Sequence, residues 1–152
     1  MKHRLVIICI VTFVFLFSLT ERPVFANEIK WYSAEEGLLL GKKEGKKVFM
    51  NFYADWCNYC KQMEATTFKD YRVVGALNSK FIAVRVNTEK NKEIAQQYFV
   101  RGLPTSWFLT ETGEKISNLP GYVEPEMLLK ILSYIGEDKY QSISFKTYLE
   151  SQ

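Results

Sequence analysis

Short apolar segments separated by polar residues run along most of the chain. Residues 47–53 and 81–86 are nearly continuous apolar stretches of strand length, which is typical of strands that are buried on both faces. Residues 105–110 and 115–119 flank a short polar turn that contains Gly113, and this pattern predicts a β-hairpin. The hydrophobic pattern therefore predicts four strands.

Helices are predicted between and around these strands from their start and stop signals. Ser33 and Glu36 form a capping box, which predicts a helix that starts there and ends near Gly45. Pro125 suits the first turn of a final helix that runs to residue 135, with Gly136 as its C-cap. Three further helices are predicted at residues 57–68, from Asp70 through Leu77, and at residues 90–98.

The order of these elements predicts the fold class. Strands that alternate with helices pair in parallel, and a terminal hairpin adds an antiparallel edge. We therefore predict an α/β domain with a mixed central sheet and helices on both faces. The apolar fraction of 47% and the aromatic fraction of 15% supply a packed core for such a domain. The formal net charge of only +3, without a long run of like charges, argues against nucleic-acid binding.

The beginning of the chain has a different pattern. Basic residues at positions 2–4 precede an almost unbroken apolar run from Leu5 to Leu19, and Val24–Ala26 supplies small residues at a cleavage position. This arrangement is typical of a secretory signal peptide. We predict a signal peptide at 1–26, a mature domain at 27–152 and a periplasmic or otherwise extracytoplasmic location. An uncleaved membrane anchor stays open as an alternative, because such a run can overlap a short membrane span.

Two cysteines, Cys57 and Cys60, remain once the predicted signal peptide is removed, because Cys9 lies inside its apolar run. A pair separated by two residues in an oxidising compartment is typical of a redox centre. At i and i+3 of a helical turn the two sulfurs can bond. Cys57 also falls at the predicted start of a helix, where free backbone N–H groups favour a thiolate. Such a thiolate can attack a substrate disulfide, and Cys60 can then resolve the mixed disulfide.

Two other interpretations of the cysteine pair stay open. The cysteines can form an inert structural disulfide, although such bridges usually close longer loops. They can also supply half of a zinc site, although tetrahedral sites usually need more ligands and the predicted mature chain has no other cysteine and no histidine. We therefore predict no bound metal and no cofactor.

The residues around the cysteines resemble the thioredoxin superfamily. The resemblance rests on Tyr53–Lys61 and Val100–Thr105, and it covers about residues 45–135. Cys60–Glu64 and the tail at Ser144–Leu149 resemble one branch of exported proteins. That branch includes the C-terminal domain of the bacterial transmembrane thiol:disulfide interchange reductase and periplasmic thioredoxins associated with sulfur oxidation. The resemblance implies a thioredoxin fold and a thiol:disulfide oxidoreductase.

The resemblance also implies roles for individual residues. Cys57 is expected to be the exposed nucleophile and Cys60 the buried resolving thiol, and together they form the redox disulfide. Substrate-binding roles are implied for Trp56, Leu103 and Pro104. Trp56 is expected to shield one side of the disulfide, and Leu103–Pro104 to be a cis peptide that faces the cysteines and pairs with an extended substrate; an ordinary trans proline is the alternative. Gly121 is expected to keep the neighbouring surface open.

The sequence departs from the superfamily pattern close to the cysteines. Many thioredoxins carry, on the strand before the first cysteine, a buried aspartate that helps to move the resolving proton, and this chain has Asn51 at that position. Glu64 lies one turn beyond Cys60 on the same helix face, so we predict that it is a catalytic carboxylate that replaces the aspartate. The alternative is an ordinary exposed helix charge. The dipeptide Asn58-Tyr59 leaves the direction of electron flow open.

These residues and this resemblance predict an exported thiol–disulfide oxidoreductase that acts on protein disulfides through Cys57 and Cys60. The branch resemblance favours a reductase, which needs electrons from a transmembrane thiol carrier. A disulfide-forming oxidant with a quinone-linked partner is one alternative, and a non-catalytic binding module with a thioredoxin fold is another. Protein thiols and disulfides are the expected partners, and we expect the chain to be a monomer.

Overall fold

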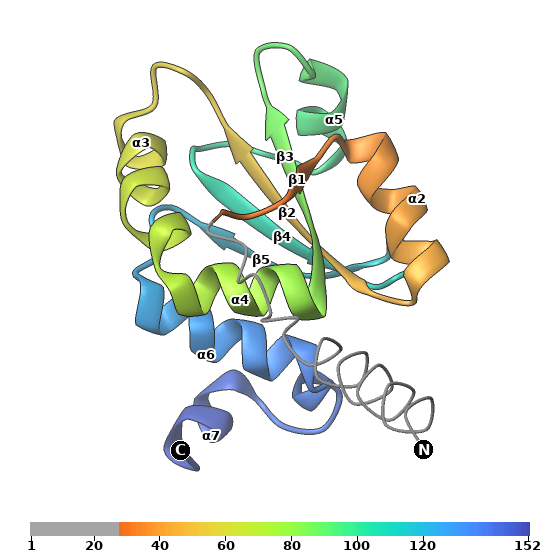
Figure 1. Cartoon of the computed structure of the whole chain (residues 1–152), viewed down its shortest axis with the longest axis vertical. Coiled ribbons are helices and arrows are strands. Elements are labelled where there is room, and N and C mark those ends of the chain that lie inside the picture. The colour runs from red at the N-terminus through yellow and green to blue at the C-terminus, as the bar shows by residue number, and fades with distance from the viewer. Residues whose placement is uncertain (1–27) are drawn as a thin grey trace, which may run out of the picture.

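A five-stranded mixed sheet forms the centre of the computed structural model, which describes residues 28–152 (Figure 1). The strands are β1 (Trp31–Tyr32), β2 (Lys47–Tyr53), β3 (Phe81–Asn87), β4 (Thr105–Leu109) and β5 (Lys115–Pro120). They lie in the order β1-β3-β2-β4-β5, with β3 parallel to β1 and β2 and with β4 antiparallel to β2 and β5. The predicted mixed sheet is confirmed, whereas the predicted signal peptide at 1–26 lies outside the described residues.

Helices cover both faces of this sheet, as predicted. They are α2 (Ala34–Glu44), α3 (Asn58–Ala65), α4 (Tyr71–Lys80), α5 (Lys92–Gln97), α6 (Pro125–Gly136) and α7 (Phe145–Glu150), with 3-10 turns η1 (Thr67–Lys69) and η2 (Lys139–Gln141). One face packs against α2 and α5, and the opposite face packs against α3, α4 and α6 (Figure 1).

Local capping signals set several helix ends. The Ser33 hydroxyl accepts a hydrogen bond from the Glu36 backbone, and the Glu36 carboxylate accepts one from the Ser33 backbone, so the predicted capping box is confirmed. Gly45 ends α2 in the left-handed conformation, with a φ of 62°. Asp70 caps α4, and Pro125 lies in the first turn of α6. Capping residues within a few positions of each helix end are therefore sufficient to set where these helices begin or end.

The central strand β2 is buried on both faces. Val48, Met50 and Phe52 pack in the layer that contains α2 and α5. Phe49 packs in the opposite layer, which contains α3, α4 and α6. Because side chains alternate along a strand, Asn51 points into the same layer as Phe49. The residue that replaces the expected aspartate therefore faces the layer of the cysteine-bearing helix.

The predicted helix at 57–68 is wrong at its end, because α3 stops at Ala65. The Thr66 hydroxyl donates a hydrogen bond to the Gln62 carbonyl at 2.8 Å. The next hydroxyl, that of Thr67, donates to the Val123 carbonyl at 2.6 Å. These bonds turn the chain into η1 and tie it to the segment before α6, so a tertiary contact ends the helix.

Two other predicted helix ends also shift. The helix predicted at 90–98 starts only at Lys92, because the Asn87 side chain accepts hydrogen bonds from the Glu89 and Lys90 backbones and holds this segment as a turn. At the other end of the chain, Gly136 remains inside α6 and Glu137 is the C-cap. The Glu137 backbone donates to the Ser133 carbonyl at 2.9 Å, which extends the last turn.

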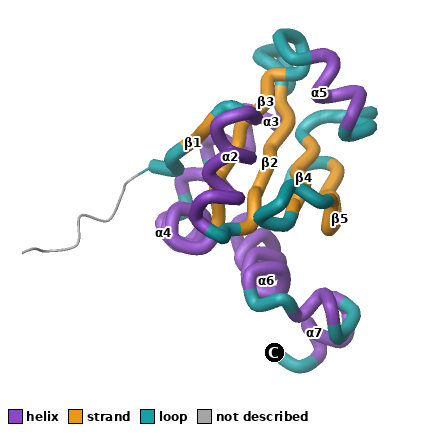
Figure 2. The backbone as a smooth tube through the Cα atoms, turned by 90° about the vertical axis from the view of Figure 1, so that its right-hand side faces the viewer, coloured by secondary structure: helices purple, strands orange, loops and turns teal. Residues whose placement is uncertain are grey.

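The C-terminal segment packs on α6 and forms no part of the sheet. Figure 2 shows α7 at the end of α6 that lies away from the sheet. Tyr134 of α6 lies 5.1 Å from Phe145 and 5.3 Å from Tyr148 between ring centroids, and its hydroxyl donates to the Ile143 carbonyl at 2.7 Å. Ser144 caps α7. The extension therefore carries a small aromatic core of its own.

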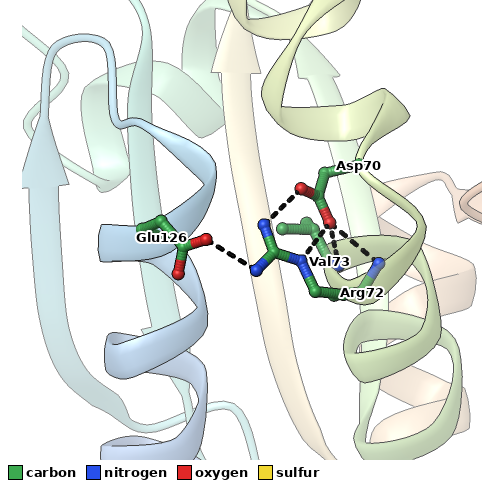
Figure 3. A network of polar contacts seen from close by, with 4 residues as sticks. All are labelled: Asp70, Arg72, Val73 and Glu126. Carbon is green, nitrogen blue, oxygen red and sulfur yellow. Dashed lines mark hydrogen bonds and ion pairs between the residues drawn. The ribbon is translucent and has the colours of Figure 1, made fainter.

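An ion-pair network links α4 to α6 (Figure 3). Arg72 donates to the Asp70 carboxylate at 2.7 Å and to the Glu126 carboxylate at 2.6 Å. The Asp70 carboxylate also accepts from the backbones of Arg72 and Val73 as the N-cap of α4. The hydrogen bond from the Arg72 side chain holds the pKa of the Asp70 carboxyl below its usual range. Asp70 thus caps α4 and holds Arg72, which in turn joins α4 to Glu126 of α6.

Candidate functional site

Cys57 and Cys60 form a disulfide at the point where the central strand gives way to a helix. β2 ends at Tyr53, and α3 starts at Asn58 with Cys57 as its N-cap. The sulfurs are 2.15 Å apart and the Cα atoms 5.2 Å apart. Cys57 Sγ accepts a hydrogen bond from the Cys60 backbone N–H at 3.1 Å. A sulfur at a helix N-terminus lies at the positive end of the helix dipole, which favours its thiolate when the bond is reduced.

Both sulfur-bearing residues are buried. Cys57 is 4% exposed and Cys60 is 5% exposed, so the expected contrast between an exposed first cysteine and a buried second one is wrong for the disulfide form. Ala54 lies with them in a small cluster, and Tyr53 and Leu103 pack against it. The loop before Pro104 therefore covers the pair in a way that the spacing of the cysteines alone does not predict.

The Leu103–Pro104 peptide is cis, so this expectation is confirmed. Leu103 packs against the cysteine cluster, and the Pro104 carbonyl accepts a hydrogen bond from the Gly121 backbone at 2.7 Å. Gly121 has a φ of 88°, a conformation that favours glycine, and a Cβ built there would meet open space. The surface at this corner is open, as expected of Gly121.

A mostly apolar cavity of about 230 Å³ lies beside the same loop. Its lining residues are Trp56, Thr88, Ala95, Val100, Arg101, Gly102 and Leu103. Trp56 is 66% exposed at its edge. Thr88 and Ala95 had no signal in the sequence, because they come from the turn after β3 and from α5 and reach the motif residue Val100 only in the folded chain. The cavity provides an apolar wall next to the cysteines.

Asn51 occupies a buried polar position in the layer of α3. It pairs in register with Ser106 of β4, and its side-chain amide donates to Ser106 Oγ at 3.0 Å. Both residues are buried. The side chain that stands where an aspartate was expected is therefore satisfied by a hydroxyl and carries no titrating group.

Glu64 forms an ion pair with Arg85 of β3, with 2.5 Å between Glu64 Oε2 and Arg85 Nη1. The Glu64 side chain is 39% exposed and that of Arg85 is 22% exposed. Arg85 was missed by sequence reasoning, although a charged residue inside the apolar run at 81–86 is an available signal. Glu64 is thus a paired carboxylate on the helix of the cysteines, and its catalytic role stays a prediction.

A family model for a thioredoxin-like domain matches residues 37–136, which is most of the described chain. The chain belongs to the thioredoxin-like family. The match begins in α2 and ends with α6, so it includes the cysteine pair, the cis-proline loop and all strands except β1.

Relatives of this thioredoxin-like protein include much longer proteins and proteins of similar length. The thiol:disulfide interchange protein DsbD of Actinobacillus pleuropneumoniae is 34% identical over 102 residues, which cover 63% of this chain and 17% of that protein. Thioredoxin-1 of Caenorhabditis elegans is 27% identical over 116 residues, which cover 76% of this chain and 96% of that protein. The chain therefore spans about a sixth of the DsbD relative and nearly all of the thioredoxin relative.

Solved structures support the same fold. A thioredoxin from Thermus thermophilus has a TM-score of 0.65 and 29% identity, covering 71% of this chain and 87% of that chain. A thioredoxin-fold protein from Helicobacter pylori has a TM-score of 0.66 and 23% identity, covering 84% of this chain and 91% of that chain. The activity rests on other observations: the family match, the similarity to a thiol:disulfide interchange protein and the disulfide-bonded cysteine pair together support a thiol:disulfide oxidoreductase.

Two observations concern metals and membranes. Within residues 28–152, histidine, cysteine, aspartate and glutamate side chains nowhere gather in groups of three or more that could hold a metal ion. In the same part of this thioredoxin-like protein, every helix is too short or too polar to cross a membrane.

Proposed function

We propose that this thioredoxin-like protein is exported and reduces disulfides in other proteins. The observation that carries the redox activity is the position of Cys57 Sγ, which accepts a backbone N–H at the start of α3. A redox dithiol benefits from this position because the thiolate is its reactive form. An inert structural disulfide gains nothing from it.

The reaction moves two electrons from the cysteine pair to a substrate disulfide. The Cys57 thiolate attacks one substrate sulfur, which forms a mixed disulfide and releases the other substrate sulfur as a thiolate that takes up a proton. The Cys60 thiol loses its proton and attacks Cys57 Sγ. The mixed disulfide breaks, the second substrate sulfur leaves as a thiolate, and the Cys57–Cys60 bond forms.

Glu64 is the proposed acceptor of the Cys60 proton. Asn51 cannot take that role because an amide does not titrate in this range. The ion pair with Arg85 supports the proposal, since it holds the Glu64 carboxylate against the strand that neighbours β2. Transfer can take place directly or through one water molecule.

Trp56, Leu103 and Pro104 are the proposed substrate-binding residues. The burial of both cysteines requires that a substrate approach along a defined route. The cavity bounded by Trp56 and Leu103 offers that route on one side of the pair. An extended substrate segment can lie along the loop before Pro104 with its apolar side chains in this cavity.

Reduction of insulin by dithiothreitol tests the enzyme proposal. The wild-type chain should accelerate the precipitation of the free insulin B chain, and a Cys57→Ser, Cys60→Ser double variant should not. A wild-type chain that only binds substrates and leaves the rate unchanged would instead favour a non-catalytic binding module.

The direction of electron flow is tested by the equilibrium reduction potential of the Cys57–Cys60 couple against glutathione. The similarity to DsbD supports a reductase that receives electrons from a transmembrane thiol carrier. A potential near about −270 mV supports this proposal, and one near about −120 mV supports the disulfide-forming alternative.

Export is tested by mass spectrometry of the protein from its native host. Cleavage of the proposed signal peptide after Ala26 gives a mature chain that begins at Asn27 in the extracytoplasmic fraction. A chain that still carries residues 1–26 and is found in the membrane fraction would identify an uncleaved anchor instead.

A further inference from the structure

The guanidinium of Arg85 is held in place by three elements next to the redox centre. Arg85 lies in register with Asn51, which puts it in the middle of the sheet. Its Cζ atom lies 4.3 Å from the ring centroid of Tyr53 on β2 and 5.5 Å from that of Trp31 on β1. The ion pair to Glu64 on α3 completes the arrangement. The guanidinium is therefore a preorganised cation.

The same guanidinium lines a cavity that reaches the second cysteine. This cavity of about 140 Å³ is lined by Tyr53, Ala54, Asp55, Cys60, Lys61 and Arg85. Asp55 and Lys61 are exposed, so water screens their charges, whereas the Arg85 side chain is mostly buried. Arg85 is therefore the least screened charge on the wall that Cys60 shares.

The contact with Glu64 is an ion pair that leaves hydrogen-bonding groups of Arg85 unused. Nη1 lies against Glu64 Oε2, and both Arg85 Nε and Glu64 Oε2 are buried without a hydrogen-bond partner among the described residues. A guanidinium carries five donors and keeps its charge throughout the accessible pH range. A buried cation with an unused donor favours an anion that forms beside it.

We propose that Arg85 is a positioning residue of the redox centre, which holds the Glu64 carboxylate and stabilises the Cys60 thiolate through the cavity that they share. The inference rests on the proposed function and deepens it. It concerns the second step, in which Cys60 loses a proton and attacks Cys57 Sγ. The charge of Arg85 lowers the cost of the thiolate, and Glu64, held by Arg85, receives the proton.

The size of the expected effect follows from the charge. An opposite charge at close range lowers a pKa by about one unit or more. Without Arg85 the pKa of the Cys60 thiol should rise by about that much, which reduces its thiolate fraction about tenfold at neutral pH. The more basic thiolate is also the stronger nucleophile, and on a logarithmic scale this offsets about half of the loss in thiolate fraction. The rate of attack by Cys60 should therefore fall at least about threefold.

The test uses an aromatic disulfide, dithionitrobenzoate, which releases a coloured thiolate at each step. Attack by Cys57 releases the first, and attack by Cys60 on the mixed disulfide releases the second. Stopped-flow measurement of the reduced protein across a range of pH follows both phases. In Arg85→Gln the second phase should slow at least about threefold and its pH midpoint should rise by about one unit, with the first phase unchanged.

Three further variants separate this role from simple loss of structure. Arg85→Lys keeps the charge, so the pH midpoint of its second phase should stay close to that of the wild type. Arg72→Gln is a matched control, since it removes an arginine paired with carboxylates that do not line the cavity, and it should leave both phases unchanged. Where Arg85→Gln does not fold, Arg85→Met keeps an unbranched stem beside Tyr53 and carries the same expectation.

An unchanged pH midpoint of the second phase in Arg85→Gln or Arg85→Met overturns the inference. Equal slowing of both phases also overturns it, because that result indicates general damage to the site. Neither outcome affects the proposed reduction of protein disulfides, which the insulin assay and the reduction potential of the wild-type chain test separately.

Discussion

The Asn51 side-chain amide donates a hydrogen bond to Ser106 Oγ across β2 and β4, in the buried layer that also holds α3. An Asn51→Asp variant replaces this neutral donor by a carboxyl of the same shape. Burial raises the pKa of such a carboxyl, because the charged form loses its hydration. The folded state then binds the proton more tightly than the unfolded state, so stability is lost as pH rises through the raised pKa.

We expect Asn51→Asp to lower the free energy of unfolding by about 1–3 kcal/mol at neutral pH. Most of the loss should be regained at mildly acidic pH, where the carboxyl is protonated and donates to Ser106 again. Urea unfolding at several pH values measures this, with Asn51→Ala as a control that cannot titrate. If the variant is equally stable at neutral and mildly acidic pH, then Arg85, which lies in register with position 51, compensates the charge of the new carboxylate.

The order of attack by the two cysteines gives a second prediction. Cys57 lies at the N-cap of α3 and Cys60 one turn further in, so Cys57 is expected to be the attacking thiol. Cys60→Ser should trap mixed disulfides with substrates, and Cys57→Ser should trap none. Gel analysis without reductant detects these species. Faster alkylation of Cys60 than of Cys57 in the reduced protein would reverse the assignment.

Most of the site could be predicted from the sequence, because its signals are short in range. The pair Cys57 and Cys60 lies within one helical turn, and the strand before it is a plain apolar run. The cis form of Pro104 came from the family resemblance, since most X–Pro bonds are trans. These features depend on residues that are close together along the chain or on a short sequence motif that the family shares.

The parts that could not be predicted depend on contacts between distant segments. The ion pair of Glu64 and Arg85 joins α3 to β3, and neither residue signals the other in the sequence. β1 has only two residues and α7 only six, which is too short for a hydrophobic period to appear. The burial of Cys57 depends on Leu103, which comes from a loop beyond α5.

The ion pair of Asp70 and Arg72 at the start of α4 makes stability depend on pH, which is the third prediction. The pKa of Asp70 is lowered by Arg72, so the folded state holds the Asp70 proton less tightly than the unfolded state. This contribution is fully present above the unfolded pKa of about 3.9 and is lost as pH falls through the lower folded pKa. We expect the advantage of the wild type over Asp70→Asn to disappear in that acidic range.

Asp70→Asn is the informative variant because asparagine caps a helix about as well as aspartate does. Asp70→Ala removes the cap as well and should cost about 1 kcal/mol at neutral pH. Glu150→Gln serves as a control, since its carboxylate and the Lys146 amine are exposed and 3.9 Å apart. A pH-independent difference between wild type and Asp70→Asn would contradict the role of the Asp70 charge.

The last prediction concerns the proton of Cys60. Asn51 cannot accept it, and the predicted mature chain has no histidine. Glu64 is on the same helix, four residues after Cys60, and Arg85 holds its carboxylate. A Glu64→Gln variant keeps the size of the side chain and one oxygen for Arg85 but removes the base. Resolution of the mixed disulfide should slow by about 10²-fold, the size of effect usual for a general base.

The same variant should leave the attack by Cys57 nearly unchanged, because that sulfur is activated by backbone N–H groups and not by a carboxylate. Stopped-flow measurement of both phases with an aromatic disulfide separates the two steps. Glu89→Gln, which lies outside both cavities beside the cysteines, is a matched control. If the resolution rate stays within about threefold of wild type, the slowing is far smaller than the loss of a general base would cause. In that case the proton leaves through the cavity to water, and Arg85 acts on the Cys60 thiolate by its charge alone.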